Sequence, residues 1–416
     1  MKSNLLVKQY NWRVPLILFT MVILTSCSSR SVDIDSFENC NNGTHPTPID
    51  QRYKFPGDLL FARSDGSEIL ALNGETHELT SVLHMPSDRF YDVSPLSQDG
   101  KTLVISYHEP GDVENLSIIL LSNLGSVEHK TVSLPTLWKD RSKIASWSSS
   151  DWVNDRYLQG NLYEEGTTGD ELWEALLFDP FELKWKTMSN INSSLNQAQG
   201  SGFSISPDLT KILYVDDKYH LILYDLIQNE TLWEYDDYDG VVPSLMSPTL
   251  SDAIWSKDGE ILALPITSED RTPTLLTLGK DGRVINSFDF ANHQHGYSWS
   301  ENNQILSFYE DRCISTDCLD AKPTILTMNI KDGSLKDLCS LPSVTVPIGG
   351  IANNRITWSP DQQFLAYTYW SGSTSQDGII LQKIGDPQLR MIEIDNDTMV
   401  LLGWSEYHWT SGNSQP

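Results

Sequence analysis

The sequence is poor in basic residues. Of 416 residues, 29 are Lys or Arg and 56 are Asp or Glu, which gives a formal net charge of −27. Nucleic acids and anionic lipids attract basic surfaces, so an acidic surface of this size argues against both as partners. We therefore expect no nucleic-acid partner, and we expect any charged partner to be cationic.

The signatures of several enzyme classes are also missing. The chain contains no G-x-S-x-G motif, no glycine-rich phosphate loop and no C-x-x-C motif. The first would indicate a serine hydrolase, the second a nucleotide enzyme and the third a thiol oxidoreductase. We expect no catalytic residues and no cofactor.

No apolar run reaches the roughly 20 residues of a membrane-spanning helix. The longest apolar run of the N-terminal region, Val14–Leu24, has 11 residues. It follows the basic residues Lys2, Lys8 and Arg13. This arrangement is typical of a secretory signal. It continues into Leu24-Thr25-Ser26-Cys27, which resembles a bacterial lipobox, although an ordinary signal peptide with an incidental cysteine has the same pattern.

The lipobox resemblance implies that residues 1–26 are a lipoprotein signal peptide and that Cys27 is lipidated. Removing residues 1–26 takes away three basic and no acidic residues, so the net charge changes from −27 to −30. A diacyl anchor would attach the chain to a membrane, in the cell envelope outside the cytoplasm. Because Ser28 rather than Asp follows the cysteine, the resemblance implies the outer membrane in a Gram-negative host.

Four further cysteines would lie in an oxidising compartment, where disulfides form. Cys313 and Cys318 enclose four residues, which indicates a local bridge. Cys40 and Cys339 are left, and a bridge between them would join the N-terminal segment to the domain. Four cysteines allow three pairings, so the sequence alone leaves the pairing open.

A repeat dominates the rest of the chain. Short strands end in Ser-Pro, Trp-Ser or a close variant, and a polar turn and a second apolar strand follow. The copies begin near Val93, Trp147, Ile205, Trp255, Trp299, Trp358 and Trp404. Units of this length with four short strands are typical of β-propeller blades. The sequence thus predicts an all-β, seven-bladed propeller, with six blades as the alternative.

The two ends of the repeat region complement each other. The first unit supplies three strands with no Trp-Ser strand ahead of them, and the last copy, LLGWSEYHW, has no strands after it. The C-terminal strand therefore completes the first blade and closes the ring, which removes two exposed sheet edges. We expect a flexible tether over 27–55, the propeller over 56–409 and a tail over 410–416.

The best copies, ITWSPDQQFLAYT and IWSKDGEILALP, resemble the TolB-type, WD40-like propeller repeat. The resemblance covers most of residues 56–409 and implies the fold but no particular ligand. The Trp of the motif packs between neighbouring sheets, and Pro, Asp and Gly form the turn. We interpret these residues as structural.

In propellers, the loops between second and third strands lie on one face, which commonly carries the binding site. These loops are acidic in this chain, and several begin with an aromatic residue. Such a surface could recognise a cationic peptide, a sugar or a protein. We take as binding-face candidates Tyr107, Glu109, Tyr163, Glu164, Tyr309, Glu310 and Trp370. The alternative interpretation is that loops in so acidic a chain are acidic everywhere.

His293 and His295 precede the copy at Trp299 and should lie on the same face. Two imidazoles with a loop carboxylate could hold a transition metal, as in TolB-like lyases that act on uronic acids. We interpret them as ordinary loop histidines and expect no metal.

The sequence therefore predicts a membrane-anchored lipoprotein whose propeller is a non-catalytic scaffold for an envelope protein. A propeller glycoside hydrolase or polysaccharide lyase, and a sugar- or peptide-capture protein, are the alternatives.

Overall fold

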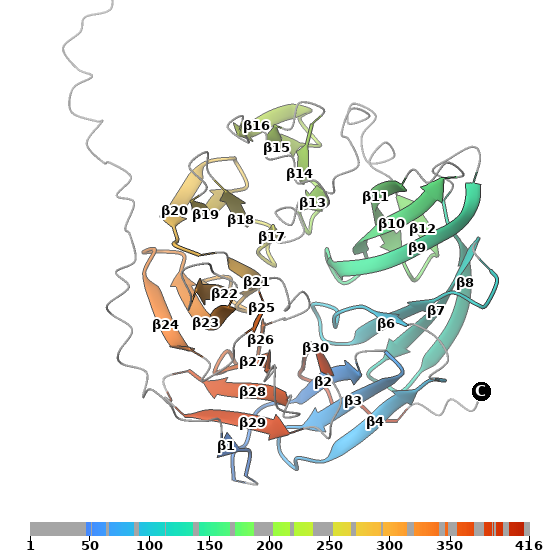
Figure 1. Ribbon diagram of the computed structural model, residues 1–416, viewed down its shortest axis with the longest axis horizontal. Helices are drawn as coiled ribbons and strands as arrows, with labels where there is room; N and C mark the ends of the chain where they lie inside the picture. Colours follow the sequence, from blue (N-terminus) through green and yellow to red (C-terminus); the bar gives the residue numbers. More distant parts are fainter. Residues whose placement is uncertain are drawn as a thin grey trace, which may run out of the picture.

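The chain forms a ring of seven sheets, each built on four antiparallel strands (Figure 1). The computed structural model describes residues 47–50, 52–63, 66–86, 91–112, 114–135, 141–166, 171–186, 203–216, 220–235, 253–267, 272–292, 294–313, 320–340, 346–347, 356–369, 378–384, 386, 388–393 and 399–411. No helix within these ranges is long and apolar enough to cross a membrane. Seven blades confirm the sequence prediction and exclude the six-bladed alternative.

The strands of the first four blades follow one another in order from the ring axis outward. Blade 1 consists of β30 (Met399–Ser405), β2 (Asp58–Arg63), β3 (Glu68–Asn73) and β4 (Leu79–His84). Blade 2 consists of β5 (Asp92–Val93), β6 (Thr102–Tyr107), β7 (Asn115–Ser122) and β8 (Val127–Ser133). Blade 3 consists of β9 (Arg141–Trp152), β10 (Leu158–Gly166), β11 (Glu171–Asp179) and β12 (Lys184–Lys186). Blade 4 consists of β13 (Phe203–Ile205), β14 (Lys211–Val215), β15 (Leu221–Asp225) and β16 (Glu230–Tyr235).

The remaining blades follow the same plan, and two of them carry an additional short strand. Blade 5 consists of β17 (Ile254–Trp255), β18 (Ile261–Thr267), β19 (Pro273–Gly279) and β20 (Val284–Asp289). Blade 6 consists of β21 (Gln294–Trp299), β22 (Ile305–Cys313), β23 (Asp320–Asn329) and β24 (Leu335–Ser340), and β25 (Val346–Pro347) pairs with β23. Blade 7 consists of β26 (Ile356–Trp358), β27 (Phe364–Tyr369), β28 (Gly378–Lys383) and β29 (Leu389–Glu393), with β1 (Thr47–Pro48) outside β29.

The C-terminal strand closes the ring, as the sequence predicts. β30 is the innermost strand of blade 1 and pairs with β2 at the other end of the chain, with Leu59 opposite Trp404. Gly403 lies at the register shift in this pairing, at φ +152°, and a Cβ there would come within 2.7 Å of the Leu96 side chain. Only glycine fits this position, because both the backbone conformation and the space exclude a side chain.

The tether boundary predicted at residue 55 is wrong, because the ring already includes residues before Pro56. Thr47 pairs with Arg390 on β29, and the Ile49 amide donates to the Met391 carbonyl at 3.0 Å. Phe55 is 3% exposed and packs in the core between blades 7 and 1. Segment 47–55 contains enough apolar side chains to bind the ring, although it is polar on average.

A serine explains why the repeat motif recurs. In blades 4, 5 and 7 the Ser Oγ donates to the Asp carboxylate two residues later at 2.6 Å. The same Oγ accepts the amide that begins the second strand, such as Phe364 in blade 7 at 2.9 Å. The motif therefore closes the turn between the first two strands. The repeat Trp side chains are 6–8% exposed in blades 1, 5, 6 and 7, so their structural role is confirmed.

The sequence pattern places the motif of blade 3 five residues too early. Trp152, not Trp147, pairs with the start of the second strand, at Leu158, much as Trp255 pairs with Leu262, the second residue of the second strand in blade 5. Trp152 is 4% exposed and its indole donates to the Pro95 carbonyl at 2.8 Å. The first strand of blade 3 is 12 residues long and contains both tryptophans, which is why the sequence pattern is ambiguous.

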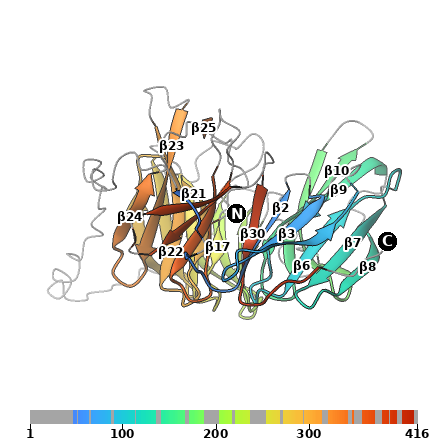
Figure 2. The same ribbon diagram turned by 90° about the horizontal axis from the view of Figure 1, so that it is seen from below.

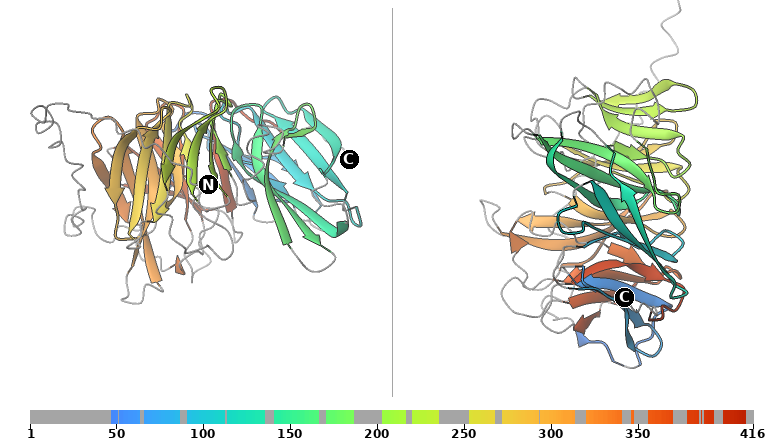
Figure 3. Two further views of the ribbon diagram at one scale, coloured as in Figure 1. Left: turned by 90° about the horizontal axis from the view of Figure 1, so that it is seen from above. Right: turned by 90° about the vertical axis from the view of Figure 1, so that its right-hand side faces the viewer.

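The ring has two different faces. We call turn face the side with the turns between first and second and between third and fourth strands, and loop face the opposite side. Second and third strands have nine or ten residues in blades 3 and 6 but five to eight in the other blades. As a result, the β10–β11 and β22–β23 hairpins both extend on the loop face (Figures 2 and 3).

Candidate functional site

The β10–β11 hairpin of blade 3 carries acidic residues to the loop face. Glu164, Glu165 and Glu171 lie where its two strands end and begin, and the register places Glu165 directly opposite Glu171. Like charges in directly opposite positions destabilise a hairpin. The candidate Tyr163 lies on the same strand, opposite Trp173. For Tyr163, Glu164, Glu165 and Glu171 the structure describes the backbone alone.

In blade 2, several loop-face residues contact or hydrogen-bond other residues of the same blade. Tyr107 is half-buried, with its ring 5.3 Å from that of Tyr91. Glu109 is half-buried as well, and its carbonyl accepts the Asp112 amide at 2.9 Å. Hydrogen bonds from the Asn115 side chain and amide lower the pKa of Asp112. These bonds join Asp112 to the first residue of β7, on the same loop that carries Glu109.

In blade 6 the candidate Tyr309 is not on the surface. Its side chain is fully buried, its ring stacks on His295 at 5.3 Å, and it meets Tyr367 of blade 7 edge-on at 6.3 Å. Burial raises the pKa of Tyr309 well above its usual value. The prediction of an exposed ring is therefore wrong, because β22 continues to Cys313 and keeps Tyr309 inside the sheet.

Glu310 is also buried, at 5% exposure, which corrects its assignment as an exposed candidate. Its carboxylate accepts a 3.0 Å bond from Arg312 Nε and a 3.2 Å bond from the Asn292 amide group. Arg312 Nη1 also reaches Asp337 at 3.2 Å. Sequence reasoning missed Arg312 and Asp337. The one signal was that Arg312 follows Glu310 by two residues, which places both on the same side of a strand.

His295 lies next to a carboxylate of the same blade. Its Nδ1 is 3.7 Å from Asp311 Oδ2, and both side chains are mostly buried. In the described part of the chain, no three His, Cys, Asp or Glu residues are placed to hold a metal ion. The candidates His293 and Trp370 lie outside the described residues, as do Cys27, Cys40 and Cys318. For Cys313 and Cys339 only the backbone is described, so lipidation and both disulfides stay predictions.

Blade 4 adds acidic groups to the loop face that were not candidates. His220 Nδ1 lies 3.1 Å from Glu234 and 3.4 Å from Asp216. Burial, with the charge of Asp216 next, raises the pKa of Tyr214 to about 12. The strands of blades 2, 3, 4 and 6 thus bring acidic residues to the loop-face end of the ring, and Glu310 of blade 6 is buried there.

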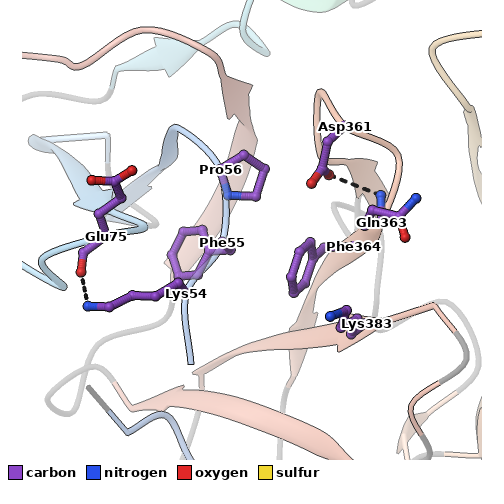
Figure 4. Close-up of a pocket in the computed structure, with 8 residues that line it drawn as sticks. All are labelled: Lys54, Phe55, Pro56, Glu75, Asp361, Gln363, Phe364 and Lys383. Carbon is purple, nitrogen blue, oxygen red and sulfur yellow. Dashed lines mark hydrogen bonds between the residues drawn. The ribbon is translucent and has the colours of Figure 1, made fainter. Parts of the chain in front are cut away.

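A groove of about 360 Å³ lies on the turn face at the seam between blades 7 and 1 (Figure 4). It is lined by Lys54, Phe55, Pro56, Glu75, Asp361, Gln363, Phe364 and Lys383. The Phe55 and Phe364 rings are 3% and 5% exposed, so they offer little apolar surface to a ligand. Two lysines face two carboxylates, so the groove has no charge preference, and we assign it no role.

No model of a known protein family matches the sequence, and no curated protein is similar to it. Solved structures are similar in fold. Oligogalacturonate lyase in complex with manganese is 12% identical with a TM-score of 0.50, covering 82% of this chain and 89% of that chain. TolB from Acinetobacter baumannii is 14% identical with a TM-score of 0.42, covering 84% and 82%. A putative TolB from Agrobacterium tumefaciens is 10% identical with a TM-score of 0.40, covering 84% and 94%. At these identities the likeness concerns the fold, and the propeller fold expected from the repeat is confirmed.

Proposed function

We propose that the chain is a lipid-anchored protein of the cell envelope, outside the cytoplasm, whose propeller binds a protein partner through its loop face without catalysis. The anchor is the lipidated Cys27 of the sequence analysis. The partner surface is the acidic end of the β10–β11 hairpin with the loop of blade 2 beside it. The two alternatives, a sugar-cleaving enzyme and a capture protein for sugars or peptides, stay predictions without a specific supporting observation.

The opposition of Glu165 and Glu171 supports this proposal most directly. A hairpin end that serves only structure gains stability from opposite charges or from β-branched pairs in this position. Two glutamates there destabilise the free hairpin, and a cationic partner would relieve that cost. The hairpin is also longer than those of most blades, so its end extends from the ring.

The partner we expect is a protein with a basic patch. Acidic groups on a rigid rim raise the rate of association with a cationic surface and select against acidic ones. The interaction should weaken as ionic strength rises, because exposed charges are screened within about 10 Å at 0.1 M salt.

Capture from envelope extract by a soluble form, residues 28–416, tests the proposal. We expect the triple variant Glu164→Lys, Glu165→Lys and Glu171→Lys to capture at least about 10-fold less of the partner than the parent, because it reverses the charge of the rim. The control variant, Glu75→Lys, Glu182→Lys and Glu230→Lys, makes the same charge change on the turn face and should capture as the parent does.

Failure of the parent to retain any protein that the loop-face variant loses would contradict the proposal, as would an equal loss in both triple variants. Glu310 is left unchanged in this experiment, because it is buried against Arg312 and its reversal would unfold blade 6.

A further inference from the structure

Three neighbouring blades each present one large apolar side chain within a turn of the turn face, whereas the exposed Leu79 and Val284 of blades 1 and 5 begin a fourth strand. Leu124 in blade 2 is 87% exposed, Phe181 in blade 3 is 43% exposed and Ile227 in blade 4 is 74% exposed. Each lies in the turn between the third and fourth strands. We call these three side chains the turn tips.

The fold does not require apolar side chains at these positions. In blade 3 the Asp179 carboxylate accepts the backbone amides of Phe181 and Glu182. In blade 4 the Asp225 carboxylate accepts those of Ile227 and Gln228. Blades 1 and 6 form the same capped turn with Asn73 and Asn329. The residues equivalent to Phe181 and Ile227 are there Glu75 and Lys331, both exposed.

Blade 2 has a tighter turn, which does not require an apolar residue at its tip either. Gly125, at φ +74°, donates its amide to the Ser122 carbonyl at 3.0 Å, and Leu124 precedes it. The matching turn of blade 5 has Gly282 at φ +79°, and an exposed Asp281 stands in the place of Leu124. Charged residues thus occupy the tip positions of blades 1, 5 and 6, and apolar residues those of blades 2, 3 and 4.

The turn tips are separate points, because each belongs to a different blade and is followed within two residues by a polar one, Ser126, Glu182 or Gln228. A protein interface needs a continuous, dehydrated core. At a bilayer interface the binding strength scales with the apolar area buried among the headgroups, and separate side chains can each contribute to that area.

The place where the chain enters the ring also favours a bilayer as the surface that the turn tips contact. β1 runs parallel to β29, and Thr47 pairs with Arg390 near the start of β29. The Thr47 Oγ1 donates to the Leu389 carbonyl at 3.4 Å. β29 starts on the turn face, so the chain that leads from Cys27 joins the ring at that face. Residues 28–46 can span at most about 65 Å. A lipid on Cys27 would therefore tether the propeller from its turn face, at most about 65 Å from the bilayer.

We propose that the turn tips dock the propeller on the surface of the phospholipid bilayer, which leaves the loop face directed away from the membrane. This docking rests on the lipid anchor of the proposed function and not on the identity of its partner. Because the mature chain carries a charge of −30, the docking prefers zwitterionic lipid.

Vesicle sedimentation tests the docking without relying on lipidation. A form of residues 28–416 with an N-terminal hexahistidine tag is held on phosphatidylcholine vesicles by a small fraction of nickel-chelating lipid, which replaces the acyl anchor. We expect the variant Leu124→Ser, Phe181→Ser and Ile227→Ser to need at least about 10-fold more lipid for half-maximal binding, because a second attachment point strengthens a tethered one. The control variant Glu75→Ser, Asp281→Ser and Lys331→Ser, in the matching turns, should stay within about 2-fold of the parent.

Equal lipid requirements for the parent and the turn-tip variant would overturn the proposal. So would a parent that is dimeric by light scattering and becomes monomeric when the turn tips are replaced, since a second copy would then be the occupant. Neither result depends on capture of a partner by the loop face, so failure of the docking and failure of the proposed function are distinguishable.

Discussion

A chain truncated after Thr398 is expected not to fold. The truncation removes β30, which supplies the innermost strand of blade 1 and pairs with β2 from Asp58 to Arg63. Four of its side chains, Met399, Leu401, Leu402 and Trp404, are at most 7% exposed. At about 1.5–3 kcal/mol for each buried side chain, their loss costs about 6–12 kcal/mol, which is comparable with the whole stability of a domain, about 5–15 kcal/mol.

Circular dichroism with thermal unfolding measures this result. The control is truncation after Ser411, which keeps β30 and Trp409, whose amide donates to Asp58 at 2.7 Å. We expect the control to unfold as the full chain does. A chain ending at Thr398 that unfolds cooperatively within a few degrees of the control would contradict closure of the ring by the C-terminal strand.

Replacing Arg312 by Met is expected to cost about 3–5 kcal/mol of unfolding free energy. Arg312 lies between the carboxylates of Glu310 and Asp337, and its side chain is 17% exposed. Without Arg312, the Glu310 and Asp337 carboxylates stay close together, and little water can solvate them because both are mostly buried. Adding Glu310→Gln to the variant removes one of these charges and should recover at least half of the loss.

Urea unfolding gives the free energies, and Arg156→Met is the matched control. Arg156 also joins two carboxylates, Asp179 and Glu182, but its side chain is 50% exposed. Asp179 is buried there but still accepts the Phe181 and Glu182 amides when Arg156 is lost, so we expect the control to be clearly less destabilising than Arg312→Met. If Arg312→Met is no more destabilising than Arg156→Met, the blade 6 cluster does not stabilise the loop-face end of the ring.

The fold could be predicted from the sequence because the repeat appears in residues that the fold itself requires. The Ser and Asp of the turns in blades 2, 4, 5 and 7 bond to each other, and the repeat Trp side chains of other blades are buried, so the pattern marks most blades. The incomplete first and last units then determine how the ring closes. β1 could not be predicted, because it is two residues long and lies in a polar segment.

The candidate site was predicted less well, because a run of charged residues was taken to mark a loop. In blade 6 the run Glu310-Asp311-Arg312 continues β22, and the ion pairs of Arg312 make its burial possible. Tyr309 is carried inside with it. In blade 3 the same expectation placed Glu164 correctly at the hairpin's loop-face end, although there too the strand extends further than expected.

The turn tips could not be recognised in the sequence, because a single apolar residue in a polar turn is common. Phe181 and Ile227 become informative only when the capped turns are compared blade by blade. That comparison needs the hydrogen bonds that show which turns are equivalent.

Photo-crosslinking in cells tests the division between the two faces most directly. A benzoylphenylalanine is introduced at Tyr163, on the β10–β11 hairpin of the loop face, or at Ile227, on the turn face. We expect a discrete protein adduct from position 163 and none from position 227. An adduct from position 227 with none from position 163 would contradict the assignment of the loop face as the partner-binding surface.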